Sequence, residues 1–364
     1  MAPRTKILLT GATGYIGGSI LNRFLARPDF QSSFDIRVLV RSPEKAPKFD
    51  ALGFKSIVGS HTDEEVMVQA VSEVDIVVGL TDCDSIPAAE LTIKGLKKHF
   101  EETGKQAFFI QTSGTGVYVQ LTNGMYTTDV IYDDANPDQI ETLAPTQPHR
   151  NVDLKILSAE NEGFFKSCIV LPSLVYGVAT GPLFDSGLSN PHSILIPLMC
   201  RVALDRRRAG MIGQGKNVWP NVDINEVADF YPILIEKIIQ SPDTVPHGRE
   251  GIYNLENDKH TSYDVAEAIG KALVALGYGD DSTPLTFTPE EEKKYFGAHV
   301  HLIGSDCRCI ATRARSFGWD PKLTTADMLG GVQKEIEILI KTGKAELKHF
   351  VSGVDPGNIQ VSSS

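Results

Sequence analysis

Several features are scarce in this sequence of 364 residues. It has only five cysteines, an odd number, and no Asn-x-Ser/Thr acceptor, which argues against a secreted protein built on disulfides. Lys and Arg number 35 against 46 Asp and Glu, and the net charge is -11. Nucleic acid and anionic membranes need a clustered positive surface, so neither is an expected partner. No apolar run is long enough for a signal peptide or a membrane span, and we expect a cytoplasmic protein.

Patterns that hold metals are also sparse. Cys307-Arg308-Cys309 has no second cysteine pair to complete a metal tetrad. His299 and His301 could share one face of a strand, but packed or exposed histidines are the commoner outcome. The sequence therefore predicts no metal site.

Short β-branched runs alternate with longer helical stretches from residue 6 to about residue 177, as in βαβ units. The expected strands are Lys6–Thr10, Ile36–Arg41, Lys55–Gly59, Val74–Leu80, Gln106–Thr112 and Ser167–Leu171. The expected helices between them lie near residues 15–26, 64–72, 87–103 and 150–163. This order predicts an α/β fold, a Rossmann doubly wound parallel sheet with its ligand crevice at the carboxyl ends of the strands.

The composition changes after Tyr176-Gly177, where loops with Gly, Pro and Ser begin. Further helices are expected near residues 193–209, 261–276, 289–296 and 324–341, and the segment Gly251–Leu255 reads as a strand that rejoins the sheet. We therefore predict a Rossmann domain over residues 1–177, a smaller and interleaved second domain over 178–350, and a flexible tail over 351–364.

The strongest local signal follows the first expected strand. Residues 10–17 read T-G-A-T-G-Y-I-G, a G-x-x-G-x-x-G run that opens a helix. Glycines there permit a tight turn and let the backbone approach a pyrophosphate, which binds the free N–H groups at the helix N-terminus. The run predicts a dinucleotide site made by Gly11, Thr13, Gly14, Tyr15, Ile16 and Gly17.

The end of the second expected strand indicates which dinucleotide binds. A carboxylate at this position would accept a hydrogen bond from the ribose 2′-hydroxyl, but this chain has Arg41, with Lys45 and Lys48 close behind. A guanidinium suits a 2′-phosphate, because it carries a fixed charge and a fork of donors. NADP(H) is therefore the expected cofactor, in preference to NAD(H), and Arg41 is its expected 2′-phosphate ligand.

Four more segments accompany the glycine run in a fixed order, namely Phe109–Thr115, Leu171–Gly177, Gly213–Ala228 and Phe317–Pro321. Together they resemble the short-chain dehydrogenase/reductase superfamily, in particular its extended or atypical members, which are similar to epimerases and dihydroflavonol-type reductases. The resemblance implies that the second domain binds a small-molecule substrate and that the protein is a monomer or a homodimer. It also implies further cofactor contacts at the crevice, from Leu80, Thr81, Thr112, Lys155, Pro172, Leu174 and Val175.

The catalytic pair of that superfamily is missing. Its reductases use a Tyr as proton donor and a Lys four residues later, which lowers the Tyr pKa and holds the ribose. If Lys155 is the motif lysine, Asn151 stands where the Tyr should be. If the register is two residues earlier, His149 replaces the Tyr and Asp153 replaces the Lys.

Other residues are therefore candidates for catalysis. Ser113 aligns with the residue that binds the substrate oxygen in the family, with Gly114 as the alternative. His149 could transfer the proton, and the other candidate donors are Tyr118, Tyr126, Tyr132 and water. Lys155 keeps an expected ribose-binding role.

The sequence thus favours an NADP(H)-dependent oxidoreductase acting on a carbonyl, an imine or an activated alkene of a small organic substrate. Two alternatives stay open. The first is a non-catalytic NADP(H) sensor similar to NmrA-like regulators, which keep the glycine loop and lack the Tyr. The second is an epimerase or dehydratase with tightly held NAD(P).

Overall fold

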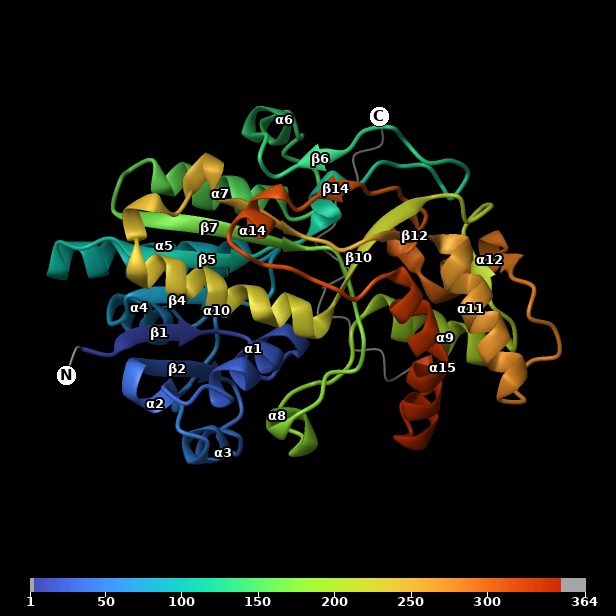
Figure 1. Ribbon diagram of the computed structural model, residues 1–364, viewed down its shortest axis with the longest axis horizontal. Coiled ribbons are helices and arrows are strands. Elements are labelled where there is room, and N and C mark those ends of the chain that lie inside the picture. The colour runs from blue at the N-terminus through green and yellow to red at the C-terminus, as the bar shows by residue number, and fades with distance from the viewer. Residues whose placement is uncertain (1–2, 348–364) are drawn as a thin grey trace.

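A seven-stranded parallel sheet organises one half of the protein in the computed structural model, which describes residues 3–347 (Figure 1). Its strand order is β11-β7-β5-β4-β1-β2-β3, and each neighbouring pair is parallel. The strands are β1 (Thr5–Leu9), β2 (Phe34–Val40), β3 (Lys55–Val58), β4 (Ile76–Gly79), β5 (Ala107–Thr112), β7 (Phe165–Pro172) and β11 (Ile252–Leu255). The order reverses direction between β1 and β4, which is where a doubly wound sheet opens its ligand crevice.

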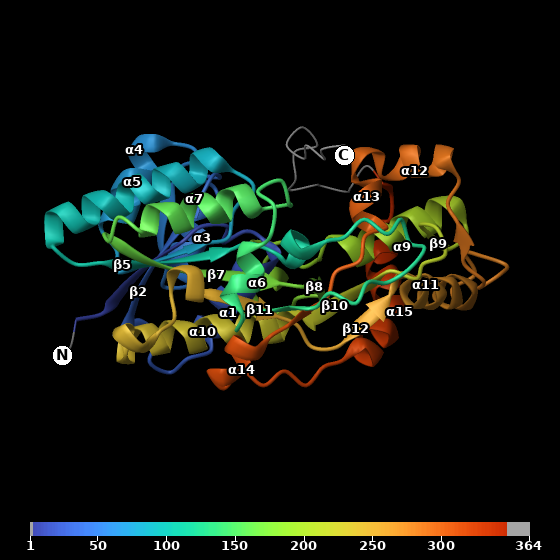
Figure 2. The same ribbon diagram turned by 90° about the horizontal axis from the view of Figure 1, so that it is seen from above.

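Helices cover both faces of this sheet. On one face lie α4 (Glu64–Ser72), α5 (Ile86–Thr103) and α7 (Arg150–Glu160), and on the other lie α1 (Tyr15–Leu25) and α10 (Ile224–Gln240), as Figure 2 shows. Every residue of β4 and β5 is buried, as expected of parallel strands covered on both sides. The predicted Rossmann sheet is confirmed, and so is the return of the strand near residues 251–255, which is β11.

A second group of helices packs beside the sheet and has its own apolar core. The members of that core include Val202, Leu273 and Ile336, which are at most 1% exposed. The helices are α9 (Leu195–Arg206), α11 (Ser262–Ala275), α12 (Pro289–Tyr295), α13 (Val300–Ile303) and α15 (Thr325–Lys341). The division at residue 177 stays a prediction, and the predicted tail at 351–364 lies outside the described residues.

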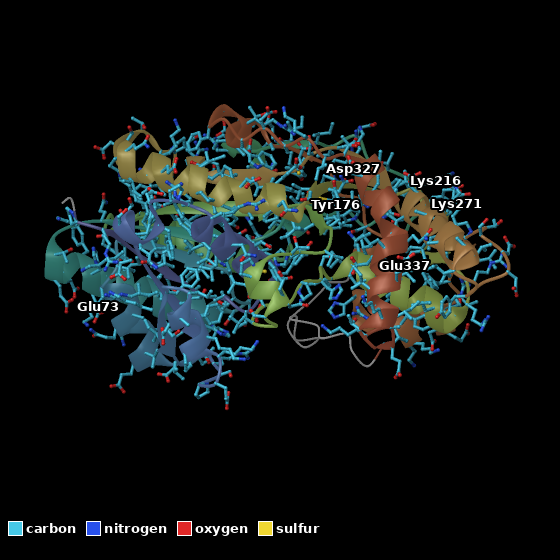
Figure 3. All side chains as sticks on the ribbon, turned by 60° about the horizontal axis from the view of Figure 1, so that its bottom comes forward. Glu73, Tyr176, Lys216, Lys271, Asp327 and Glu337 are labelled. Atoms are coloured by element: carbon cyan, nitrogen blue, oxygen red, sulfur yellow. The ribbon has the colours of Figure 1, made fainter. Side chains whose placement is uncertain are left out.

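A three-stranded sheet joins the two halves. It has the order β12-β10-β8 and consists of β8 (Leu174–Tyr176), β10 (Val218–Asp223) and β12 (Lys259–Thr261). The Tyr176 hydroxyl donates a hydrogen bond of 3.1 Å to the carbonyl oxygen of Thr324, immediately before α15. Figure 3 shows Tyr176 near the end of α15 that carries Asp327. This contact fixes the second group of helices against the strand that leaves the crevice.

The remaining elements are short. The strands pair as β6 (Tyr132–Asp133) with β14 (Cys309–Ile310) and as β9 (Gly210–Met211) with β13 (Leu285–Thr286). The helices are α2 (Phe30–Ser33), α3 (Ala46–Ala51), α6 (Pro137–Glu141), α8 (Pro182–Asp185) and α14 (Thr312–Ser316), with 3-10 turns at residues 115–118, 242–244, 248–250 and 297–299. Within residues 3–347, none of the helices combines the length and the apolar character needed to cross a membrane.

Helix α10 was missed by the sequence analysis, which treated residues 213–228 only as a motif. Asp223 caps the helix by accepting a hydrogen bond from the Asn225 amide, and Pro232 lies inside it. A proline in a helix interior removes one backbone hydrogen bond, so it interrupts the usual helix signal. The buried face of Val227, Tyr231, Leu234, Ile235 and Ile238 has helical spacing and could have revealed the helix.

Candidate functional site

The glycine loop, which we define as residues 10–17, follows β1 at the crevice. Gly11 has φ of +74°, and a Cβ atom there would lie 2.4 Å from the carbonyl oxygen of Leu80. A Cβ atom on Gly17 would lie 2.2 Å from the carbonyl oxygen of Gly11. These two glycines are therefore required by the turn and by the close packing of α1 on the loop.

Gly14 has a different environment. A Cβ atom there would meet only the carbonyl oxygen of Gly11, at 3.1 Å, and the other space around it is open. Gly14 is also the N-cap of α1 and gives the helix no side-chain cap, so the positive end of α1 is available to an anion. The loop thus has the shape and the polarity that fit a dinucleotide pyrophosphate, with Thr13, Gly14, Tyr15 and Ile16 at the helix start.

A segment that we call the strap, residues 181–192, packs against the glycine loop. The Ser189 hydroxyl donates to the carbonyl oxygen of Ala12 at 2.8 Å, and the Asn190 amide donates to that of Thr13 at 3.0 Å. The Lys45 ammonium donates to the carbonyl oxygen of Leu188 at 2.8 Å. The bonds from Ser189 and Asn190 use carbonyl oxygens of the loop, whereas a phosphate binds N–H groups, so the strap supports the loop without taking the phosphate donors.

Arg41 lies at the carboxyl end of β2 and is exposed. Burial, together with the positive charge of Arg41, lowers the pKa of His61, which places these two side chains near each other. Lys45 bonds the strap, as described above, so the expected cluster of Arg41, Lys45 and Lys48 is not one group of free cations. Arg41 and Lys48 both stay exposed, and of the two Arg41 is the one that directly follows β2.

The other predicted cofactor residues are divided between several environments. The Leu80 amide donates to the Thr10 hydroxyl at 3.1 Å, beside the glycine loop, and Thr81, the next residue, is partly exposed. The Thr112 hydroxyl instead forms a hydrogen bond of 2.7 Å with the Tyr231 hydroxyl of α10. It therefore points to the face of the sheet that α1 and α10 cover.

The predicted cofactor residues at and after the end of β7 also lie in different environments. Val175 packs against the same buried cluster of Ala179, Phe184 and Ile224 as Tyr15 and Ile16 of the glycine loop. The Tyr15 hydroxyl donates to the carbonyl oxygens of Tyr176 and Gly177, at 3.0 and 2.5 Å. Pro172 is buried at the end of β7, and Leu174 is buried in the core of the second helical group. Val175 is therefore the residue of this stretch that the fold brings to the glycine loop.

Ser113 follows β5 and forms the centre of a buried polar contact. Its hydroxyl donates to Asp153 Oδ2 at 3.1 Å. Asp153 is 2% exposed and its Oδ1 atom has no hydrogen-bond partner among the described residues, so the carboxyl group retains an acceptor for an added ligand. Burial raises the pKa of Asp153 to about 6, against the opposing effects of His149 and Ser113.

His149 is held in an unusual backbone conformation. It is the N-cap of α7 with φ of +66°, a left-handed conformation that a side chain other than glycine adopts only at a cost of about 1 kcal/mol or more. Such strain occurs often at functional sites. The strain is retained here because the ring is fixed on both sides.

One side of the ring faces β4. His149 Nδ1 lies 2.8 Å from Asp84 Oδ1 and 3.3 Å from Cys83 Sγ. Burial favours the neutral ring, but the contacts with Cys83 and Asp84 outweigh it and raise the pKa of His149 well above its usual value. The pKa of Asp84 is lowered although burial acts to raise it, because His149 hydrogen-bonds the carboxylate. The pair is therefore an imidazolium and a carboxylate at neutral pH.

The other side of the ring faces the backbone after Ser113. A Cβ atom on Gly116 would lie 2.9 Å from His149 Nε2, and one on Gly114 would lie 3.4 Å from it. These glycines allow the imidazole to lie directly against the end of β5. The structure therefore brings Ser113, Asp153 and His149 together. This arrangement corresponds to the register in which His149 replaces the Tyr and Asp153 replaces the Lys.

Four of the residues predicted as candidates, Tyr118, Tyr126, Tyr132 and Lys155, lie elsewhere. Tyr118 is fully buried, donates its hydroxyl to Asn254 Oδ1 at 3.0 Å and stacks on Tyr132 with 4.7 Å between ring centroids. Lys155 is exposed on α7 and pairs with Glu90 of α5 at 2.7 Å. Tyr126 is 55% exposed on a loop. These side chains are not joined to Ser113 or His149 by any contact within the described residues.

The sequence analysis missed Cys83 and Asp84. Both follow β4 at its carboxyl end, and that position was a usable signal, because this edge of a doubly wound sheet forms the crevice. Together with His149 they are the one group of metal-binding side chains found within residues 3–347, with ligand atoms within 4.8 Å of one another. The hydrogen bond between His149 and Asp84 engages two of those atoms.

Sequence comparison finds proteins that are similar to this chain. Residues 3–93, which contain the glycine loop, match the model of the NmrA-like family. The oxidase ucsJ of an Acremonium species is 27% identical over 358 residues, which cover 92% of this chain and 97% of the relative.

Solved structures show the same fold over nearly the whole chain. The UDP-glucose 4-epimerase of Thermotoga maritima, solved with UDP-glucose, gives a TM-score of 0.62 at 16% identity and covers 93% of this chain and 99% of its own. The dTDP-glucose 4,6-dehydratase of Bacillus anthracis, solved with NAD, gives 0.60 at 18% identity and covers 95% and 99%. The sheet, the glycine loop and these matches show that the chain has the same fold as these sugar-nucleotide epimerase and dehydratase structures and that its residues 3–93 are similar to the NmrA-like family.

Proposed function

We propose that the protein is an NADP(H)-dependent oxidoreductase that reduces a carbonyl, an imine or an activated alkene of a small organic substrate. The observation that carries the proposal is the pair formed by His149 and Asp84, which lies against the backbone after Ser113 at the carboxyl edge of the sheet. Arg41 supports the choice of NADP(H), because it is exposed at the end of β2. When bound, the cofactor supplies the hydride.

His149 is the proton donor in this proposal. Its Nδ1 atom is engaged by Asp84 at 2.8 Å, so the imidazolium gives up its proton from Nε2. Loss of a positioned acid of this kind costs a factor of about 10²–10⁴ in rate. Asp84 keeps the ring charged and oriented, as a carboxylate does beside other catalytic histidines.

Ser113 binds the substrate oxygen. Its single hydroxyl hydrogen goes to Asp153 in the free protein and turns to the substrate when the substrate is present. A protonated Asp153 can donate to Ser113 and leave that hydrogen free, and the raised pKa of Asp153, about 6, brings this state within reach. The buried polar contact of Ser113 and Asp153 thus positions a donor at the crevice.

The test combines cofactor binding with turnover. NADPH binding is measured by fluorescence titration, and NADPH oxidation is followed with a panel of carbonyl, imine and activated alkene compounds. We expect Ser113→Ala to lower kcat/KM by a factor of about 10²–10³ and to leave the Kd of NADPH unchanged. Ser72→Ala is the matched control, since Ser72 is a buried serine of α4 whose hydroxyl donates to the carbonyl oxygen of Gln69.

A non-catalytic NADP(H) sensor is the second candidate, and the NmrA-like match of residues 3–93 favours it. Protein that binds NADPH tightly and oxidises none of it across the panel would support the sensor and count against the reductase. Release of bound NAD(P) on denaturation of the purified protein would instead point to an epimerase or dehydratase.

A further inference from the structure

We propose that the substrate is an imine bound in its protonated form, and that Asp153 Oδ1 accepts the hydrogen of its N–H group. The inference rests on the proposed function and deepens it, because it selects one of the three substrate classes named above. It also gives Asp153 a role in binding the substrate.

Asp153 has one occupied and one open oxygen atom. It lies on α7, one helical turn after His149, and is 2% exposed. Its Oδ2 atom accepts the hydroxyl hydrogen of Ser113 at 3.1 Å, whereas Oδ1 has no hydrogen-bond partner within residues 3–347. Buried polar atoms of folded proteins are nearly always hydrogen-bonded. An open oxygen beside Ser113, where β5 ends at the crevice, therefore indicates a donor that the ligand brings.

The neighbouring cations do not occupy this oxygen. The His149 ring bonds Asp84 through Nδ1 at 2.8 Å, and Arg150 donates through Nη2 to a carbonyl oxygen of α6 at 3.4 Å. Burial and the charge of Asp84 favour the neutral form of Asp153, whereas His149, Ser113 and Arg150 favour the carboxylate. The pKa of Asp153 is raised to about 6 by burial, so the carboxylate predominates at pH 7.

The open oxygen distinguishes between the three substrate classes. The oxygen of a carbonyl compound, or of the group that activates an alkene, only accepts hydrogen bonds. Neither of these reacting groups can donate to a carboxylate oxygen. A protonated imine has an N–H donor and a positive charge on its reacting group, and hydrogen bonds between charged partners are short and strong. Asp153 therefore fits the protonated imine and disfavours the other two classes.

The reduction of a protonated imine balances without a further proton donor. The imine carbon gains the hydride that NADPH supplies when bound, and the electron pair of the C=N bond moves to the nitrogen. The products are a neutral amine, which keeps its hydrogen on Asp153 Oδ1, and NADP⁺. Ser113 keeps its hydrogen bond to Oδ2 during this step and so holds the carboxylate in position. An imine that arrives protonated takes no proton from His149.

The first test compares three compounds on the unaltered full chain with NADPH at pH 7. They are methylpyrroline, a cyclic imine that is largely protonated at this pH, its N-methylated ion, which has the same charge and no N–H group, and cyclopentanone. We expect kcat/KM for methylpyrroline to exceed that for each of the others by a factor of about 10–100, as expected of a hydrogen bond to a charged group. Equal or faster reduction of cyclopentanone, or of the N-methylated ion, would overturn the inference and leave the proposed reductase function intact.

The second test measures binding and needs no turnover. Methylpyrrolidine, the amine product, is protonated at pH 7, and its Kd is measured by calorimetric titration of the full chain with NADP⁺ present. We expect Asp153→Asn, which removes the charge and keeps the shape, to raise this Kd about 10- to 100-fold. Asp35→Asn is the matched control and should leave the Kd unchanged, because Asp35 is 8% exposed and pairs with Lys55 near the start of β2, at the opposite edge of the sheet.

The two tests separate a failure of the inference from a failure of the proposed function. If none of the three compounds is reduced, the reductase function fails, and the binding test decides whether Asp153 accepts a hydrogen bond from a cationic N–H group. Absence of methylpyrrolidine binding, or the same Kd in Asp153→Asn and the unaltered protein, would overturn the inference. If Asp153→Asn does not fold, the quaternary dimethyl ion of the same ring, which lacks an N–H group, takes its place, and equal binding of the two amines to the unaltered protein would be the contrary result.

Discussion

The Ser189 hydroxyl donates a hydrogen bond of 2.8 Å to the carbonyl oxygen of Ala12, across 177 positions of the chain. This bond fastens the strap to the glycine loop. The two segments are thus connected directly, and we expect a change in the strap to alter the glycine loop.

Gly18→Ala tests this connection. A Cβ atom on Gly18 would lie 2.6 Å from the Cβ atom of Ser189 and 2.9 Å from the ring of Phe184, so the strap must move. We expect a loss of about 1–3 kcal/mol in the free energy of unfolding, measured by chemical denaturation, together with weaker NADPH binding.

Gly331→Ala is the control, because nothing lies within 4 Å of the added carbon and alanine favours the helix by up to about 1 kcal/mol. Equal stability of the Gly18 and Gly331 variants would contradict the close contact.

Lys155→Met tests the register of α7. The Lys155 ammonium pairs with Glu90 at 2.7 Å, with the two side chains 44% and 50% exposed, and such exposed pairs contribute about 0–1 kcal/mol. We expect the Kd of NADPH and kcat to stay within about twofold of the unaltered protein. A much larger loss of NADPH affinity would return Lys155 to the ribose-binding role that the family resemblance implies.

Arg41→Ala tests the choice of cofactor. A hydrogen bond to a charged group contributes about 1.5–3 kcal/mol, so we expect NADPH to bind about 10- to 100-fold more weakly. NADH lacks the 2′-phosphate, and its Kd should change little. Lys48→Ala, which alters a nearby exposed lysine, is the control. Equal effects of Arg41→Ala on the Kd of NADPH and of NADH would show that the guanidinium does not bind the 2′-phosphate.

The pH dependence of reduction tests the proton donor. Since the folded-state pKa of His149 is raised above its usual value, the ring is charged at neutral pH, and kcat/KM should be highest below that pKa. It should fall as the pH rises through the raised pKa, by about tenfold per pH unit.

In His149→Gln this alkaline fall should disappear and the remaining rate should be low. The Asp153→Asn variant separates the second titration, since burial raises the pKa of Asp153 to about 6. An unchanged alkaline limb in His149→Gln would assign the proton to another group.

The sequence alone determined the sheet and the cofactor loop. Strands β2, β4, β5 and β7 are largely apolar runs of the length that parallel strands require. The glycine run at residues 11–17 directly indicates a tight turn. Ser113 and Arg41 could also be placed, because each follows a strand directly. These signals are local, so they need no knowledge of distant contacts. Helix α10 is the exception, since Pro232 interrupts its pattern.

Only the tertiary structure decided which residues meet at the carboxyl edge of the sheet. His149 and Asp153 are one helical turn apart and share a face, whereas Lys155 lies about 200° further round the helix from Asp153 and points to α5. The sequence around residues 149–155 alone allowed both registers of the Tyr and Lys motif. Asp84 meets His149 across 65 positions, and the strap meets the glycine loop across a still longer interval. Such pairs leave no periodic trace in the sequence, because chain folding alone brings them within hydrogen-bond distance.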